Sequence, residues 1–139
     1  EAMEEHHLKV EEKYCVNLQP TMTGAQVSMK EYLSEDPELP TAYVAVNDII
    51  ALGAMKALKD RHYRIPDDIS IIGFDNMPFC EISSPPLTTF NVLKEEIGRT
   101  AARLLISQSE EQFRLPSKLE ILTDFIERDS VKNIGSADS

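Results

Sequence analysis

Residues 66–76 of the chain read PDDISIIGFDN. The Pro-Asp-Asp turn leads into a continuous apolar run from Ile69 to Phe74, which is typical of a central parallel strand covered on both faces. Asp75 and Asn76 follow at the carboxyl end of this strand, where open α/β sheets bind their ligands. The stretch therefore predicts an α/β sheet that carries a polar site at one edge.

A second apolar run, residues 41–46, also ends in polar residues, at Asn47 and Asp48. Because parallel strands end at the same edge of a sheet, Asn47 and Asp75 are expected on one edge. A carboxylate accepts hydrogen bonds from hydroxyl groups and an amide both donates and accepts, so this pair suits a neutral polyhydroxy ligand. The residues alone leave an alternative open, in which Asp48 only caps a helix and Asp75 only orders a turn.

Strand and helix patterns alternate over the rest of the chain. We expect a strand within residues 10–18, a helix that begins at a Thr23 cap, a helix over 49–60 capped by Asn47 or Asp48, an amphipathic helix over 93–108 and a strand over 119–125. Residues 132–139 have no apolar pattern and are predicted to be a disordered tail. The alternation predicts a three-layer α/β fold with a mostly parallel sheet.

The helix expected over residues 49–60 is apolar over a wider arc than a core requires. Most of its apolar residues share one face, whereas Ile49 and Leu52 fall on the side of Lys56 and Lys59. These two are either singly exposed apolar residues, which are common, or part of a partner surface.

Composition limits the function classes. The net charge of −10 over 139 residues opposes contact with phosphate backbones, so this segment itself is not expected to grip DNA. The two cysteines, Cys15 and Cys80, have no zinc or disulfide spacing, which favours a reducing cytoplasm. No apolar run approaches the roughly 18 residues that span a bilayer, and no membrane partner is expected.

Sequence motifs for catalysis are missing. The chain has no GxSxG elbow, P-loop or HExxH, so no enzyme activity, catalytic residue, metal site or cofactor is expected. Two weaker alternatives are a metal at His6 and His7, which point to different helix faces, and a phosphoacceptor at Asp75, which would need an acidic cluster with magnesium.

The chain carries five motifs in order: PTA at 40–42, VNDIIALGA at 46–54, IPDDISIIGFDN at 65–76, PLTT at 86–89 and IERDS at 126–130. Together they resemble the LacI/GalR family of bacterial transcriptional repressors. In that family a DNA-binding headpiece precedes an effector-binding core of two periplasmic-binding-protein-like subdomains, with the ligand between them. The resemblance implies that residues 1–131 are the C-terminal part of this core, and that residues 87–110 cross toward an N-terminal subdomain that is absent here, like the headpiece. The apolar stripe of the helix over 93–108 is then expected to fold back, swap between chains or mediate oligomerisation.

By position, the resemblance assigns effector contacts to Asn47 and Asp75, with Tyr43 on the strand that approaches the pocket. It implies a dimer interface made by Ile49, Leu52, Lys56, Met77, Phe79 and Ile82. The implied function is the sensing and dimerisation part of a cytoplasmic, homodimeric repressor, which binds a sugar or sugar phosphate and contacts DNA only through the headpiece. The alternative is a sugar-binding protein of a transport system with the same core, which predicts a signal peptide upstream.

Overall fold

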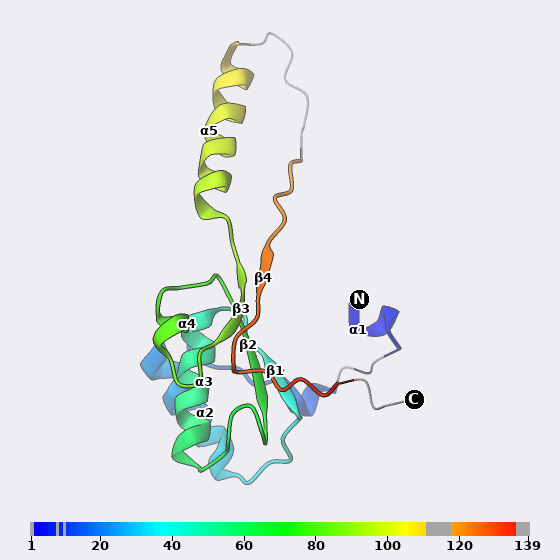
Figure 1. The fold of residues 1–139 in the computed structure, drawn as a ribbon, viewed down its shortest axis with the longest axis vertical. Helices are drawn as coiled ribbons and strands as arrows, with labels where there is room; N and C mark the ends of the chain where they lie inside the picture. Colours follow the sequence, from blue (N-terminus) through cyan, green and yellow to red (C-terminus); the bar gives the residue numbers. More distant parts are fainter. Residues whose placement is uncertain (1, 8, 10, 111–117, 136–139) are drawn as a thin grey trace.

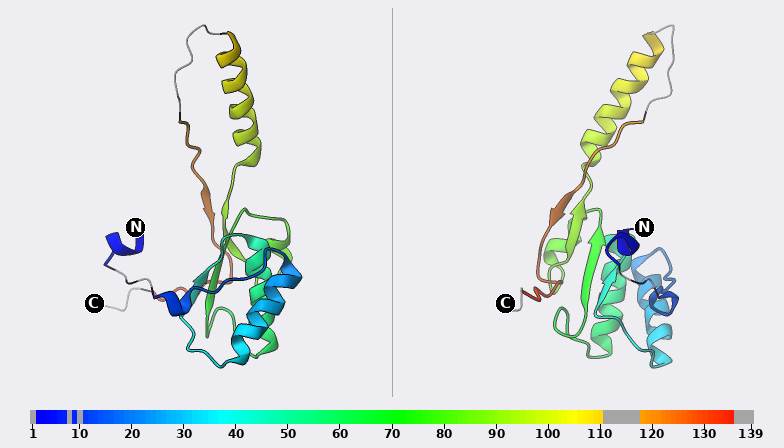
Figure 2. Two further views of the ribbon diagram at one scale, coloured as in Figure 1. Left: turned by 180° about the vertical axis from the view of Figure 1, so that it is seen from behind. Right: turned by 90° about the vertical axis from the view of Figure 1, so that its right-hand side faces the viewer.

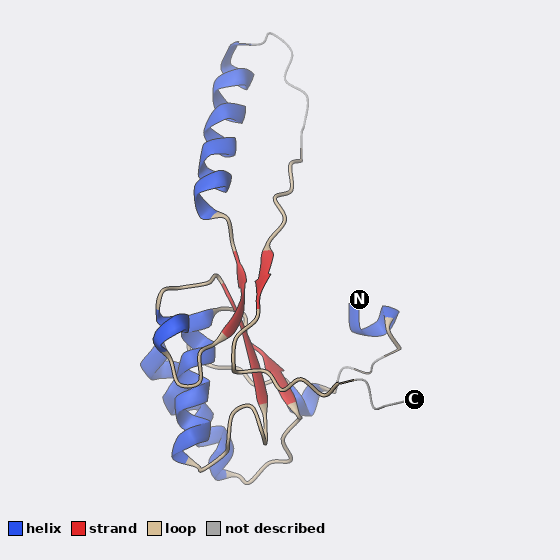
Figure 3. Cartoon of the chain, in the orientation of Figure 1, coloured by secondary structure: helices blue, strands red, loops and turns tan. Residues whose placement is uncertain are grey.

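The computed structural model describes residues 2–7, 9, 11–110 and 118–135 (Figure 1). Its helices are α1 (Ala2–Glu5), the 3-10 helix η1 (Glu12–Tyr14), α2 (Met22–Ser34), α3 (Asp48–Asp60), α4 (Phe79–Ile82) and α5 (Lys94–Glu110). Its strands are β1 (Ala42–Val44), β2 (Ser70–Phe74), β3 (Thr88–Asn91) and β4 (Asp124–Ile126). They form one sheet in the order β1-β2-β3-β4, in which the first three strands are parallel and β4 is antiparallel to β3 (Figure 3). The predicted α/β class with a mostly parallel sheet is therefore confirmed.

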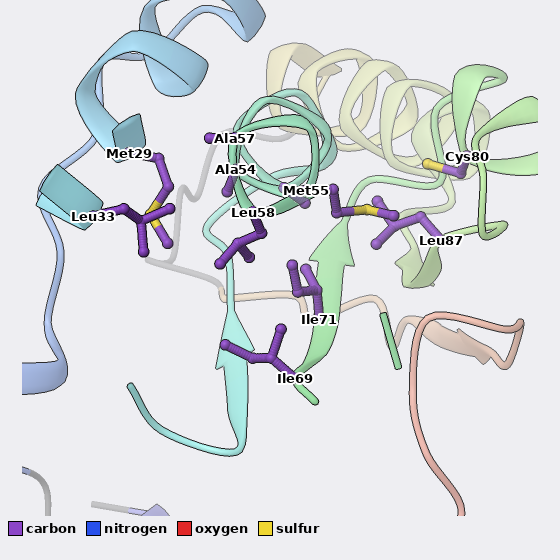
Figure 4. Packing of buried hydrophobic residues seen from close by; sticks show 11 residues of the cluster. Met29, Leu33, Ala54, Met55, Ala57, Leu58, Ile69, Ile71, Cys80 and Leu87 are labelled. Carbon is purple, nitrogen blue, oxygen red and sulfur yellow. The ribbon is translucent and has the colours of Figure 1, made fainter. Parts of the chain in front are cut away.

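The hydrophobic core lies between the sheet and helices α2 and α3 (Figure 4). It is made by Met29 and Leu33 of α2, Ala51, Ala54, Met55, Ala57 and Leu58 of α3, Ile69 and Ile71 at β2, Cys80 of α4 and Leu87 before β3. The broad apolar face predicted for α3 is thus the face that it buries. No helix among the described residues has the length and apolar character needed to cross a membrane.

Close contact between α2 and α3 depends on one glycine. A Cβ atom at Gly53 would lie 2.7 Å from the Ala25 Cβ and would overlap the Met22 carbonyl oxygen. The two helices can approach this closely because neither side presents a bulky group at the contact.

The prediction that Thr23 caps α2 is wrong, because the cap is Thr21. The Thr21 hydroxyl oxygen accepts a hydrogen bond from the backbone N–H of Gly24 at 3.1 Å, and its own backbone is extended. The Thr21 cap bonds a main-chain N–H, so it needs no particular side chain three residues later. Gln26, which suggested a cap at Thr23, therefore does not decide where α2 begins.

The strand predicted within residues 10–18 is also wrong where the structure describes it. Residues 12–14 form η1, and residues 15–18 run extended without joining the sheet; residue 10 lies outside the described residues. Val16 and Leu18 pack, partly buried, against the core cluster. Their apolar character therefore comes from packing on the core and not from strand pairing.

The strand predicted over residues 119–125 is shorter and ends later. It pairs with β3 only from Asp124, which faces Asn91, the last residue of β3. Residues 118–123 have no partner strand, and Leu119 and Leu122 are exposed. Of the predicted tail, residues 132–135 have irregular, mostly exposed backbone and residues 136–139 lie outside the described residues.

Helix α5 stands away from the sheet and the other helices (Figures 1 and 2). Residues 91–93 lead out to it, and residues 118–123 return beside this outgoing segment to β4. Ile97, Leu105 and Ile106 of α5 are exposed. The helix does not fold back on the domain, which removes the first of the three arrangements expected for its apolar stripe.

Candidate functional site

The strand register places Asn47 and Asp75 on the same edge of the sheet. Strands β1 and β2 pair Val44 with Ile72, and each candidate residue lies three positions further along its own strand direction. The Ala45 N–H, one residue past this pair, still donates to the Ile72 carbonyl oxygen at 2.8 Å. The edge formed by the carboxyl ends of β1 and β2 therefore carries both an amide, from Asn47, and a carboxylate, from Asp75.

Asn47 uses one of its side-chain atoms within the fold. Its Oδ1 accepts a hydrogen bond from the backbone N–H of Ile50 at 2.9 Å and so caps α3. The remaining polar group of the half-buried side chain is the Nδ2 amide, which only donates. Of the two caps predicted for this helix, the structure selects Asn47.

Asp75 has its backbone fixed and its carboxylate free. Its N–H donates to the Phe90 carbonyl oxygen at 2.9 Å, and its carbonyl oxygen accepts a hydrogen bond from the Lys94 Nζ. Its φ of +113° is rare for a residue other than glycine. Within the described residues, the partly buried carboxylate forms no hydrogen bond or ion pair, so both oxygens are available as acceptors.

Two polar residues that the sequence did not indicate as site residues, Asn91 and Arg128, contact Asn76, the residue that follows Asp75. Asn76, at φ +49°, donates from Nδ2 to the Asn91 Oδ1 at 3.2 Å. Arg128, whose side chain is only 12% exposed, donates from Nη2 to the Asn76 Oδ1 at 2.8 Å and from Nη1 to the Leu87 carbonyl oxygen at 2.8 Å. The guanidinium thus fixes the Asn76 side chain. The Asp75 carboxylate next to it keeps both oxygens without a hydrogen-bond partner among the described residues.

Tyr43 is not brought to this edge. It faces Ile71 in the middle of β1 and lines a largely apolar cavity of about 500 Å³ between β1 and residues 15–18. Burial, and then the neighbouring Tyr32, raise the pKa of the Tyr43 hydroxyl. That hydroxyl oxygen is buried and forms no regular hydrogen bond within the described part of the chain. No group of three or more His, Cys, Asp or Glu side chains among the described residues is placed to hold a metal ion.

Residues 1–131 match the sequence family described as "Periplasmic binding protein-like domain". The chain belongs to this family. A relative among curated proteins is the HTH-type transcriptional repressor PurR of Haemophilus influenzae (strain PittEE), 35% identical over 136 residues that cover 96% of this chain and 40% of the relative. The periplasmic binding protein-like domain described here thus spans less than half the length of such relatives.

Solved structures agree with this assignment. A LacI family transcriptional regulator from Arthrobacter sp. FB24 in complex with lactose has a TM-score of 0.72 and 30% identity, over 83% of this chain and 43% of that one. A LacI family regulator from Enterococcus faecalis V583 with bound ribose has a TM-score of 0.71 and 33% identity, over 83% and 42%. This periplasmic binding protein-like domain is accordingly part of the effector-binding domain of a LacI/GalR-family regulator.

Away from the edge, the domain has a second surface of exposed apolar side chains. Phe79 is 51% exposed and Ile82 80% exposed, and both line a shallow groove of about 390 Å³ with Leu52 and Lys56 of α3. The structure thus brings together four of the six residues predicted for a dimer interface. Ile49 and Met77 are partly buried and do not line this groove.

Proposed function

We propose that the chain is the effector-sensing and dimerisation part of a LacI/GalR-type transcriptional repressor, and that its effector is a sugar or sugar phosphate. The observation that carries this proposal is the pair at the carboxyl edge, where Asn47 offers a donor and Asp75 two acceptor oxygens. A sugar hydroxyl both donates and accepts, so adjacent hydroxyl groups match this pair. The lactose and ribose bound by the two solved relatives support the same ligand class.

Only one wall of the ligand pocket belongs to this chain under the proposal. The other wall comes from a second subdomain in a longer polypeptide, joined through residues 87–110, and DNA is bound by a helix-turn-helix headpiece. Effector binding shifts the population between two arrangements of the subdomains and thereby changes DNA affinity. The protein acts in the cytoplasm, with no catalytic step. The named relative is a repressor, which disfavours the transport-protein alternative.

Self-association forms part of the proposal. The surface made by Leu52, Lys56, Phe79 and Ile82, flanked by Ile49 and Met77, contacts the same surface of a second copy. An isologous contact of this kind needs a single patch that is complementary to itself. Phe79 and Ile82 of α4 supply exposed apolar side chains to this surface, and Lys56 and Lys59 of α3 line the same groove.

A thermal-shift titration tests the sensing role. D-ribose, lactose and ribose 5-phosphate are added to the expressed full-length protein, and a ligand that binds the folded state raises the melting temperature with increasing concentration. Asp75→Asn keeps the size of the side chain and removes its charge. We expect the shift to disappear in this variant. A shift of equal size in Asp75→Asn would contradict the assignment of the site.

A further inference from the structure

Asp48 is a completely buried carboxylate between the edge site and α4. It is the first residue of α3, and its side chain points away from that helix toward the neighbouring strands. Oδ1 accepts a hydrogen bond from the Thr89 hydroxyl at 2.6 Å, and Oδ2 accepts one from the Met77 backbone N–H at 2.7 Å. A buried carboxylate is tolerated only when such bonds replace water, so this position is specified by its partners.

These bonds hold the two residues that follow Asp75. In the first of these bonds the Thr89 hydroxyl donates its proton to the Asp48 Oδ1. The lone pairs of that hydroxyl then face Asn76, whose backbone N–H donates to the Thr89 Oγ1 at 3.4 Å. Asp48 therefore fixes Met77 directly and Asn76 through Thr89.

The backbone at this turn needs such support. Asp75 and Asn76 both have positive φ, +113° and +49°, and two such residues in succession persist only when their surroundings hold them. Gly73 supplies a second, independent sign that the carboxylate is built into the fold. A Cβ atom at Gly73 would overlap the Asp48 Oδ1, so the strand leaves room for this oxygen.

The same carboxylate also reaches the beginning of α4. Cys80 is buried, and its backbone N–H donates to the Met77 carbonyl oxygen at 2.9 Å. Burial, and then the nearby Asp48, raise the pKa of the Cys80 thiol to about 12. The buried thiol beside Asp48 therefore stays protonated at neutral pH.

We propose that Asp48 is a positioning residue for the effector site. It touches no ligand, and it holds the Asp75 carboxylate in its binding orientation through Met77, Thr89 and Asn76. This inference rests on the function proposed above. It adds that the affinity of the site depends on a buried side chain of α3 and on a hydroxyl of β3.

The experiment compares four single variants, and the double variant Asp48→Asn/Thr89→Val, with the wild-type full-length protein. Asp48→Asn and Thr89→Val each break the relay, Thr89→Ser keeps the hydroxyl, and Thr21→Ala is a control that removes the α2 cap away from this edge. Amide hydrogen exchange is measured at Asn76 and Met77, and D-ribose and lactose affinities are measured by calorimetry. We expect exchange at these two amides to rise about tenfold or more in Asp48→Asn, as for a lost bond to a charged group, and to stay unchanged in Thr21→Ala.

Affinity for the sugar that binds should fall by a similar factor in Asp48→Asn and Thr89→Val but not in Thr89→Ser. Because both side chains act in one relay, the double variant should bind no more weakly than the worse single variant. Unchanged exchange in folded Asp48→Asn overturns the proposal, as does an equal loss of affinity in Thr21→Ala. If Asp48→Asn does not fold, Thr89→Val decides by the exchange rate at Asn76, whose N–H bonds Thr89, and by the sugar affinity. If the wild type binds neither sugar, the ligand assignment fails, while the exchange rates still decide the role of Asp48.

Discussion

The Asn47 side chain serves the fold and the proposed site at once, because its Oδ1 bonds the Ile50 N–H at 2.9 Å while its Nδ2 remains available. The two roles can be separated by mutation. Asn47→Asp keeps a capping oxygen but loses the donor, so its free energy of unfolding should be close to that of the wild type while sugar binding weakens. Asn47→Ala loses both groups and should also be destabilised by about 1 kcal/mol. Urea unfolding and calorimetry measure the two effects, and equal stability of the Asp and Ala variants would refute the cap.

The backbone of Asp75 predicts an unusual order of stabilities. At φ +113° a residue with a Cβ atom is strained, and the Asp75 carboxylate forms no hydrogen bond within the described residues that would offset this strain. We therefore expect Asp75→Gly to be more stable than both the wild type and Asp75→Ala, by about 1 kcal/mol. Both variants should lose sugar binding. Thermal unfolding of the three proteins checks the order, and an alanine variant more stable than the glycine variant would argue against strain.

Two helical glycines give a matched pair for the α2–α3 contact. Gly53→Ala places a methyl group against Ala25 and the Met22 carbonyl. We expect this overpacking to lower the free energy of unfolding by about 1–3 kcal/mol. A methyl group at Gly98, in α5, would meet no other part of the described chain within 4 Å. Gly98→Ala should therefore leave the free energy of unfolding unchanged or raise it by up to about 1 kcal/mol, because alanine favours the helix more than glycine does. Circular dichroism with urea unfolding distinguishes these outcomes.

Self-association should depend on α4. Ile82→Glu places a charge at the centre of the proposed dimer surface, and we expect the dimer to dissociate in sedimentation-velocity experiments, with little change in unfolding. Val27, which is 50% exposed on α2 and does not line that groove, is the matched control, so Val27→Glu should leave the dimer intact. A wild-type protein that is monomeric at micromolar concentration would exclude the proposed interface.

The thiols should differ in reactivity and in their effect on stability. Cys15 is exposed and Cys80 is buried with its pKa raised to about 12, so at pH 8 a disulfide reagent should label Cys15 quickly and Cys80 only on unfolding. The folded state keeps the Cys80 proton to higher pH than the unfolded chain does, whose thiol titrates near 9. The contribution of the Cys80 thiol to the free energy of unfolding is therefore complete below pH 9, and it is lost as the pH rises from 9 toward 12. A Cys80→Ala variant should lack this decline.

Local patterns predicted β2, α3 and the edge that carries Asn47 and Asp75, because apolar runs and strand ends are properties of neighbouring residues. Local patterns did not locate the α2 cap, because Thr21 bonds the main-chain N–H of Gly24 and this bond requires no particular side chain nearby. They also missed the contacts that hold the turn after Asp75. Asp48 meets Thr89 across 41 residues and Arg128 meets Asn76 across 52, and no local periodicity encodes such pairs.

The bond from the Lys94 ammonium group to the Asp75 carbonyl joins the first residue of α5 to the residue that offers the free carboxylate. A change in the angle between α5 and the sheet would move the Lys94 backbone relative to the Asp75 carbonyl, so the bond persists only if the exposed lysine side chain changes its rotamer. A fluorescent probe attached to α5 therefore tests, from outside the edge, whether sugar binding beside Asp75 also changes the tilt of the projecting helix.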